Sequence, residues 1–294
     1  MKGLVLLKPI KIKSSINNYQ IIFKPVNKVF DFKDDDQYFY IIDANIKKIY
    51  YKDIFNKNLI TIDANENNKT LSTVSRLIEK LKSLGANKKS TLIVIGGGIT
   101  QDVCTMVASI FMRGINWILI PTTLLSMVDS CIGGKSSINI NKFKNLAGNY
   151  YPPHKILIFV KYCTSLGKLK IIEGLCEALK IIYASSPNNL KNMTDFTFQK
   201  IEDLKNVQNI TYTSLLKKKK FVEEDEFDQN QRLLLNFGHT FGHAIESASK
   251  YQVPHGVAIG LGMILAINYS ENKNNQNITT LETYLKFLLK QWDD

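Results

Sequence analysis

Short apolar runs separated by polar turns fill the first half of the chain, a pattern that predicts buried strands. Nearly continuous apolar runs are typical of strands in a parallel sheet that is covered on both faces. Four runs qualify: 38–42 (YFYII), 59–62, 91–95 (TLIVI) and 117–120. Apolar residues also recur at helical spacing from Thr70 to Leu84, and Gly85 is placed to end that helix. A second helix is predicted at 100–112.

Three glycines at 96–98 stand between the predicted strand 91–95 and the helix that follows it. Strand, glycine run, helix and strand is the layout of a nucleotide-binding α/β unit, in which backbone N–H groups and a helix N-terminus approach a pyrophosphate. The run lacks the full dinucleotide fingerprint, and a tight structural turn explains it equally well. Asp43, after the strand 38–42, is either a partner for a ribose or adenine or a turn residue.

Strand-like runs disappear after about Leu166, and helical patterns replace them. Five helices are predicted at 173–184, 190–227, 232–249, 256–269 and 278–292. The expected fold class is therefore an α/β N-terminal nucleotide-binding domain followed by an all-α C-terminal domain. The expected boundaries are 1–165 and 166–294, with a linker near 160–168.

Charge adds little to this picture. The net charge is +12, but the lysines are scattered along the chain rather than gathered in one patch. The one dense run, 217–220, is followed by four acidic residues at 223–226, which favours a solvated helix over a nucleic-acid-binding surface. We expect no nucleic-acid partner, although a positive field also suits a small anionic substrate.

Targeting signals are equally sparse. No apolar run approaches the ~18 residues of a membrane-spanning helix, and the run 3–7 ends at Lys8 and Pro9, too early for a signal peptide. The cysteines have no CxxC spacing and lie in apolar contexts, as reduced core cysteines do: Cys104, Cys131, Cys163 and Cys176. We expect a cytoplasmic protein without a membrane partner.

The candidate chemistry concentrates around two histidines, His239 and His243. Residues i and i+4 share one face of a helix, so both imidazoles could point at one metal ion or one substrate. Two unremarkable core or surface histidines are the alternative. Apolar neighbours at 233–235 and 244–245, together with the polar groups of Arg232 and Asn236, predict a buried polar pocket.

Two loop-like stretches offer further polar groups. In 127–140, Gly133 and Gly134 bring the backbone close and Lys135 supplies a charge suited to a phosphate or carboxylate. Lys144 and Asn145 follow in a second predicted loop. Glu177 and Lys180 lie about one turn apart on the predicted helix 173–184.

Six blocks, in order and at natural spacing, resemble 3-dehydroquinate synthase and its sugar phosphate cyclase relatives: IGGGITQDV, RGINWILIPTTLLSMVDSCIGGKSSIN, KNLAGNYYPP, GLCEALK, RLLLNFGHTFGHAIE and PHGVAIGLGM. The resemblance covers roughly residues 60 to 270. It implies an NAD-binding α/β domain, a helical domain and an active site in the cleft between them. It also implies bound NAD, one divalent metal ion (most often Zn²⁺, with Co²⁺ as an alternative) and a homodimer.

The resemblance assigns roles residue by residue. The implied metal ligands are Glu177, His239 and His255, which leaves His243 on the substrate side. The implied substrate and catalytic residues are His243, Lys135, Asp129, Asn145, Lys180, Lys218, Arg232 and Asn236. The implied NAD contacts are Asp43, Asn45, Glu66, Lys69, Gly97, Gly98, Asp102, Thr122, Thr123 and Lys144.

The implied reaction converts a seven-carbon sugar acid phosphate into a carbocycle with release of phosphate, as in the shikimate pathway to aromatic amino acids. Other sugar phosphate cyclases, of the 2-deoxy-scyllo-inosose or valiolone type, share most of these motifs. A metal-dependent NAD alcohol or glycerol phosphate dehydrogenase, and a homologue that only binds, are the alternatives from other classes. The family continues past the position of Asp294 through a late basic loop. We therefore expect low activity, and we expect the anionic groups of the substrate to be bound by Lys135, Lys180, Lys218 and Arg232.

Overall fold

The computed structural model describes residues 7–188, 190, 203–270 and 275–293. The chain divides into two units. The first comprises Met1–Thr122 and Ser130–Ser165, and the second comprises Thr123–Asp129 and Leu166–Asp294. The segment Thr123–Asp129 was expected in the N-terminal domain by sequence, and it groups instead with the helical unit.

A seven-stranded sheet forms the centre of the first unit, in the order β1-β2-β9-β6-β5-β3-β4. All neighbouring strands run parallel except β1 and β2. The strands are β1 (Ile10–Ile12), β2 (Tyr19–Phe23), β3 (Tyr38–Asp43), β4 (Leu59–Ile62), β5 (Thr91–Gly96), β6 (Asn116–Pro121) and β9 (Lys155–Ile158). The four predicted strands are confirmed as β3 to β6, and the patterns of β1, β2 and β9 were too short to stand out.

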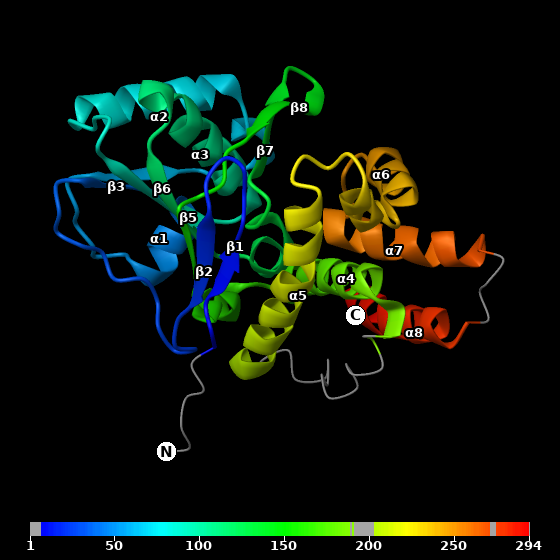
Figure 1. Cartoon of the computed structure of the whole chain (residues 1–294). Helices are drawn as coiled ribbons and strands as arrows, with labels where there is room; N and C mark the ends of the chain where they lie inside the picture. The colour runs from blue at the N-terminus through cyan, green and yellow to red at the C-terminus, as the bar shows by residue number, and fades with distance from the viewer. Residues whose placement is uncertain (1–6, 189, 191–202, 271–274, 294) are drawn as a thin grey trace, which may run out of the picture. The chain divides into compact units, whose positions relative to one another are not determined.

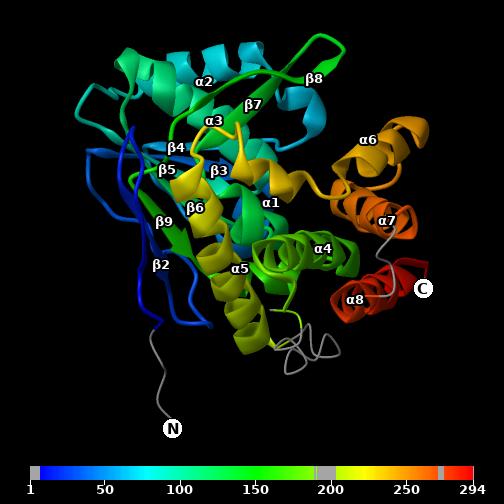
Figure 2. The same cartoon turned by 45° about the vertical axis from the view of Figure 1, so that its right-hand side comes forward.

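Three helices cover this sheet (Figures 1 and 2): α1 (Ala44–Tyr50), α2 (Leu71–Ser83) and α3 (Gly98–Ile110). The chain leaves β3 toward one edge through α1, and returns through α2 and α3 toward the other. Right-handed crossovers in opposite directions place their helices on opposite faces of a sheet. Figure 1 accordingly shows α2 and α3 on one face and α1 on the other.

The two predicted helices of the first unit are confirmed with small shifts. Thr70 caps α2 by accepting a hydrogen bond from the Thr73 N–H, and Val74, Leu77 and Leu81 form its buried face. The second helix, α3, begins at Gly98 rather than at 100, so its first turn directly follows the glycine run.

A β-hairpin stands where the sequence predicted loops, so that prediction is wrong. It consists of β7 (Lys135–Ile140) and β8 (Phe143–Tyr150). The Gly133-Gly134 pair does form a turn, with φ of 100° and 65°, but the strand begins immediately after it. The mostly exposed β8 offered no apolar alternation from which to recognise a strand.

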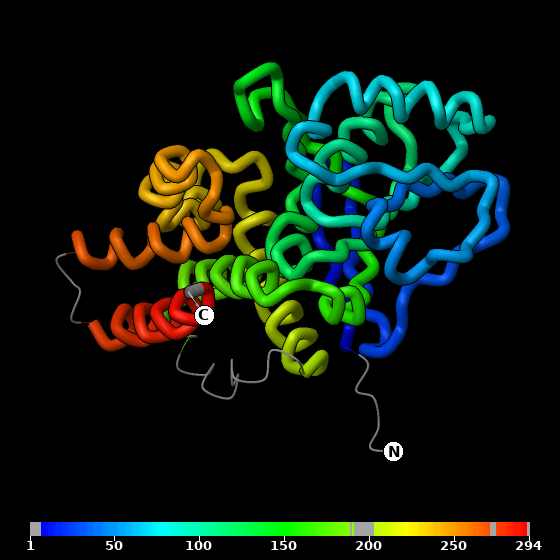
Figure 3. Tube along the Cα trace, turned by 180° about the vertical axis from the view of Figure 1, so that it is seen from behind, coloured from blue at the N-terminus to red at the C-terminus, as the bar shows by residue number. Residues whose placement is uncertain are grey.

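The second unit is built around α4 (Lys168–Ser185), in which every residue from Ile171 to Ile182 is buried. A helix that is buried on all sides needs neighbours around it, and α5 (Leu204–Glu224), α7 (His255–Asn268) and α8 (Gln276–Asp293) pack against it. Figure 3 shows α4, α7 and α8 side by side. All regular elements among the described residues after Ser165 are helices, which confirms the predicted fold class.

The predicted helix 232–249 is wrong as one element. It divides into a 3₁₀ helix, η7 (Gln231–Asn236), and α6 (His239–Ala248). Gly238 separates them with φ of 81°, a left-handed conformation that a glycine adopts readily. A side chain there would also meet the backbone N of Met263 at 2.8 Å. Of the predicted helix 190–227, α5 covers 204–224, and 191–202 lie outside the described residues.

Glycine also brings α6 and α7 into close contact. A Cβ on Gly262 of α7 would lie 2.2 Å from the Gly238 carbonyl oxygen and 2.6 Å from the Gly242 nitrogen. Both are backbone atoms, so the two helices approach to a distance that only glycine permits. No helix among the described residues is long and apolar enough to cross a membrane.

Candidate functional site

The carboxyl edge of the sheet carries the first candidate site, at the boundary between β3 and β5. The connections leaving these adjacent strands run in opposite directions, which makes this a topological switch point. In open α/β sheets, ligands bind outside the carboxyl ends of the strands at such a point. Asp43 ends β3, Gly96 ends β5, and Gly97 and Gly98 follow it.

The N-terminus of α3 at this edge suits a phosphate group. Gly97 is its N-cap, with no side-chain hydrogen bond to the first turn, so the N–H groups there remain for a ligand. A Cβ on Gly98 would meet nothing within 4 Å, whereas one on Gly96 would meet Thr100 at 2.5 Å. Gly96 therefore serves helix–strand packing, and Gly98 opens the approach to the helix end.

Asp43 has a structural role at the same edge. Its Oδ1 accepts hydrogen bonds from the N–H groups of Asn45 at 2.7 Å and Ile46 at 3.4 Å, which caps α1. Burial raises the pKa of Asp43 above its ordinary value, and these two bonds only partly offset that effect. Asp43 therefore acts as the residue that begins the turn into α1, and a ligand role for Asp43 and Asn45 stays a prediction.

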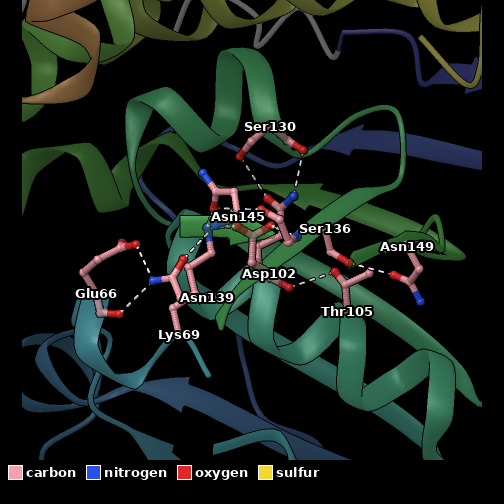
Figure 4. A network of polar contacts seen from close by, with 11 residues as sticks. Glu66, Lys69, Asp102, Thr105, Ser130, Ser136, Asn139, Asn145 and Asn149 are labelled. Atoms are coloured by element: carbon pink, nitrogen blue, oxygen red, sulfur yellow. Dashed lines mark hydrogen bonds and ion pairs between the residues drawn. The ribbon is translucent and has the colours of Figure 1, made fainter. Parts of the chain in front are cut away.

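A polar network links α3, the 3₁₀ helix η1 (Glu66–Asn68) and the β7–β8 hairpin (Figure 4). Lys69 stands at its centre, with Nζ 2.6 Å from Asp102 Oδ2 and 2.7 Å from Asn145 Oδ1. Asn139 Nδ2 donates to Glu66 Oε1 at 2.8 Å, and Asn139 Oδ1 accepts from the Asn145 N–H at 2.9 Å. Predicted residues Glu66, Lys69, Asp102 and Asn145 therefore meet.

Two features of this network concern its charge and shape. Burial raises the pKa of Asp102, and the nearby Lys69 only partly counteracts it. Asn145 adopts a left-handed conformation with φ of 54°, which asparagine tolerates better than most residues. Asn139 was missed by the sequence analysis, because its role becomes visible only when the hairpin is paired.

The remaining predicted residues of this region lie elsewhere. Lys144 is exposed on β8 and Lys135 is exposed at the first position of β7. Thr122 is buried directly after β6. Thr123 belongs to the second unit, where its Oγ1 lies 2.8 Å from the Ser126 hydroxyl.

A buried ionic cluster forms the second candidate site, in the helical unit. Asp129 pairs with Lys218, whose Nζ also donates to the Asp129 carbonyl at 2.8 Å. Lys180 pairs with Glu177 one turn away on α4 and lies 3.8 Å from Asp129 Oδ2. Glu177, Lys180 and Lys218 are all buried, so Lys218 is not the solvated residue that its charged run suggested.

The pKa values of the cluster reflect its mixed charges. Burial alone raises the pKa of Asp129, but Lys218 and Lys180 outweigh it and hold the pKa well below the ordinary value. Burial raises the pKa of Glu177, and Lys180 reduces this rise. Burial lowers the pKa of Lys218, and the neighbouring Arg232 adds to the effect.

Glu177, His239 and His255 come together beside this cluster. One ligand atom from each lies within 4.8 Å of the others. His255 Nε2 is 3.5 Å from Glu177 Oε1, and the His239 and His255 ring centroids are 5.8 Å apart. Burial lowers the pKa of His239 to about 3, which keeps its imidazole neutral, the form that binds metals.

These residues fit a divalent metal ion. Lys180 pairs with Oε2 of Glu177, whereas Oε1 is buried without a hydrogen-bond partner and faces His255 Nε2. A buried carboxylate oxygen without a donor is costly, and a metal ion bound to it removes the cost. One carboxylate and two imidazoles are a donor set typical of catalytic zinc, with a position left for substrate.

Arg232 is buried and held by the loop between α5 and η7. Its Nη1 donates to the Glu226 carbonyl at 2.6 Å. The carboxylate of Asp225 accepts from the N–H groups of Gln229, Asn230 and Arg232, at 2.9, 2.6 and 3.1 Å. Asp225 thereby fixes the backbone on which Arg232 stands.

The predicted buried pocket around His243 is wrong in part. His243 and Asn236 are exposed, and Leu233 and Leu234 are 48% and 56% exposed. The 3₁₀ turn and the break at Gly238 rotate these residues away from the apolar core that a continuous helix would have reached. His243 still lies near His239, with ring centroids 5.2 Å apart.

Family models match both units. The model of the 3-dehydroquinate synthase N-terminal region matches residues 59–173, and that of its C-terminal region matches residues 174–292. A 3-dehydroquinate synthase of Dictyoglomus thermophilum is 39% identical over 243 residues, 80% of this chain and 68% of the relative. A 3-dehydroquinate synthase of Streptococcus equi subsp. equi is 33% identical over 267 residues, which is 87% of this chain and 74% of the relative.

A solved structure extends the similarity to the fold. A 2-deoxy-scyllo-inosose synthase in complex with carbaglucose-6-phosphate, NAD⁺ and Co²⁺ superimposes with a TM-score of 0.82 at 26% identity, over 98% of this chain and 82% of that one. Together with the two family models, which cover the chain from 59 to 292, these similarities show that the chain belongs to the 3-dehydroquinate synthase family.

Proposed function

We propose that this chain is an NAD- and metal-dependent cyclase that converts a seven-carbon sugar acid phosphate into a carbocycle and releases phosphate, as 3-dehydroquinate synthase does. The observation that carries the proposal is the convergence of His239 and His255 on Glu177, whose buried Oε1 lacks a hydrogen-bond partner. The family membership identifies which metal-dependent chemistry this donor set serves. Relatives of known structure have been solved with NAD⁺ and with Co²⁺ or Zn²⁺.

The described residues offer a candidate place for each cofactor. NAD would lie at the carboxyl edge of β3 and β5, with its pyrophosphate at the Gly97–Gly98 end of α3. The metal ion would be held by Glu177, His239 and His255. When bound, NAD supplies a hydride acceptor, and the metal ion polarises a substrate oxygen.

The protein's own residues bind and orient the substrate. Arg232 presents a planar fork that can hold a carboxylate or phosphate in two parallel hydrogen bonds. Lys218 adds a second cation, and Asp129 keeps that cation in place through its carboxylate and carbonyl. The exposed imidazole of His243 can accept a proton from a substrate hydroxyl through a ring nitrogen.

Three further expectations belong to this proposal. A homodimer and a cytoplasmic location are usual for such an enzyme and stay predictions for this chain. We take the substrate to be the seven-carbon sugar acid phosphate of the shikimate pathway, because the similar proteins named above are 3-dehydroquinate synthases. The cyclase of known structure belongs to the 2-deoxy-scyllo-inosose type, so that substrate is the alternative.

The test is an assay of the purified protein, with NAD and Zn²⁺ or Co²⁺, against a panel of sugar phosphates. We expect phosphate release with the seven-carbon sugar acid phosphate and a carbocyclic product whose mass equals that of the substrate less one phosphoric acid. Release from a hexose phosphate instead would assign the alternative cyclase. Oxidation of simple alcohols, with steady NADH production and no phosphate release, would place the chain among the dehydrogenases.

A further inference from the structure

Helix α6 turns three polar side chains toward the start of α7. His239, His243 and Glu246 stand at positions i, i+4 and i+7 of α6 and therefore share one face. His255 is the first residue of α7, which packs against α6. The family motifs imply roles for all three histidines and none for Glu246.

The two ring nitrogens of His255 face two different carboxylates. Nδ1 is 3.1 Å from Glu246 Oε2, and Nε2 is 3.5 Å from Glu177 Oε1. A neutral imidazole donates from one nitrogen and accepts at the other. When Nδ1–H donates to Glu246, the Nε2 lone pair faces a carboxylate oxygen that is itself an acceptor. Two acceptors in that position need either a second proton on Nε2 or a metal ion between them.

The two distances distinguish a hydrogen bond from a shared metal ion. With bonds of about 2.0–2.2 Å and tetrahedral angles, two ligand atoms of a zinc ion lie roughly 3.4 Å apart. The separation of His255 Nε2 and Glu177 Oε1, at 3.5 Å, matches that value. The separation of His255 Nδ1 and Glu246 Oε2, at 3.1 Å, is shorter and matches a hydrogen bond.

We propose that Glu246 is a positioning residue for the metal centre. Its carboxylate accepts the Nδ1 proton of His255, which selects one tautomer, orients the ring and presents Nε2 to the ion bound by Glu177 and His239. Carboxylate partners of this kind raise the basicity of a ligating histidine, and their loss costs about 10- to 100-fold in metal affinity. The inference rests on the metal centre of the proposed function.

A competing arrangement uses the same side chains differently. His243, Glu246 and His255 also bring one ligand atom each within 4.8 Å of the others. In that arrangement Glu246 binds the ion itself and His239 does not. The two arrangements predict opposite responses to substitution of His239 and His243, which makes them separable by experiment.

The experiment measures Co²⁺ affinity of the metal-free protein by competition with a chelator, without substrate or turnover. We expect Glu246→Ala to weaken Co²⁺ binding about 10- to 100-fold and Glu246→Gln to weaken it less, because an amide oxygen still accepts the proton. His239→Ala should weaken binding strongly, and His243→Ala should leave it unchanged. Glu282→Ala, which breaks a surface ion pair with Lys286 on α8, is the matched control.

A second measurement is independent of affinity. With only four histidines in the chain, ¹⁵N spectra of labelled histidine can report the tautomer of His255. We expect the Nδ1–H form in the wild-type protein and in Glu246→Gln, and a mixture of tautomers in Glu246→Ala. This readout uses Glu246→Gln to test the role even if the alanine variant fails to fold.

Each contrary result has a distinct meaning. Unchanged Co²⁺ affinity in Glu246→Ala would overturn the positioning role while leaving the metal centre intact. Affinity lost in His243→Ala and kept in His239→Ala would make Glu246 a ligand. A wild-type protein that binds no Co²⁺ would overturn the metal centre of the proposed function, and the role of Glu246 with it.

Discussion

Replacing Gly262 with alanine should force α7 away from α6. The added Cβ would lie 2.2 Å from the Gly238 carbonyl oxygen and 2.6 Å from the Gly242 nitrogen. These are backbone atoms of the turn and helix that carry His239, so no side-chain rotation can relieve the contact. The helices must separate, and the separation moves His239 relative to His255 on α7.

The size of the effect follows from these distances. Ordinary van der Waals contact begins at 3.4 Å, so the backbone must move by about 1.2 Å at the closest point. Overpacking of this kind costs about 1–3 kcal/mol in stability. Metal ligands keep their distances within about 0.2 Å, so a shift of this size should also weaken metal binding at least about tenfold, or ~1.4 kcal/mol.

Thermal melting of the metal-free protein and a Co²⁺ titration check the two effects separately. A domain of this size loses roughly 2–4 °C in melting temperature per kcal/mol. Gly167→Ala is the matched control, because a Cβ there meets nothing within 4 Å; it should leave Co²⁺ affinity unchanged and cost at most about 1 kcal/mol as the N-cap of α4. If Gly262→Ala melts and binds Co²⁺ like the wild-type protein, the close approach of α6 and α7 does not hold the metal site together.

Three further predictions address the other parts of the account. Gly97→Val should abolish NAD binding while the protein stays folded; unchanged affinity by calorimetry would remove the glycine loop from the site. Arg232→Lys should lower kcat/KM by about tenfold or more, since lysine cannot form two parallel hydrogen bonds; wild-type kinetics would dismiss that role. Hydrogen bonds from Gln229 and Asn230 hold the pKa of Asp225 below its ordinary value. This stabilisation is present above the unfolded-state pKa and is lost as pH falls through the lower folded-state pKa. The urea midpoints of wild type and Asp225→Asn should therefore converge on acidification, and a constant gap would contradict the argument.

Much of the fold follows from local patterns in the sequence. The segments that form β3 to β6 are nearly continuous in apolar residues because both faces of the sheet are covered. Such burial can be recognised from the sequence alone. The strands β1, β2 and β9 are short, and their identity depends on pairing between distant segments: β2 pairs with β9, more than 130 residues away. Such pairing is decided by the assembled sheet rather than by local pattern.

The break at Gly238 shows where local pattern fails in the helical unit. Apolar residues continue at helical spacing through 232–249, so a single helix was predicted. The close approach of Met263 and the carbonyl of Ile259 leaves no room for a side chain at 238, and the left-handed turn there redirects the chain. The exposure of Leu233 and Leu234 is a consequence of that turn.

Some site residues could be recognised from the sequence, and others only from the structure. Glu177, His239 and His255 were found because their motifs match a family, and the structure brings them together. Asp225 stood in an acidic run that suggested a solvated surface, yet it accepts three backbone N–H groups. Glu246 gave no separate signal, since its partner His255 lies nine residues away across a turn.

The most direct test of the account records phosphate and reduced nicotinamide together during one reaction. The purified protein receives NAD, Co²⁺ and the seven-carbon sugar acid phosphate. We expect one phosphate released for each carbocycle formed, with no accumulation of NADH, and loss of phosphate release when a chelator removes the metal ion. NADH that accumulates in step with substrate consumption, while the phosphate stays esterified, would contradict it and identify a dehydrogenase instead.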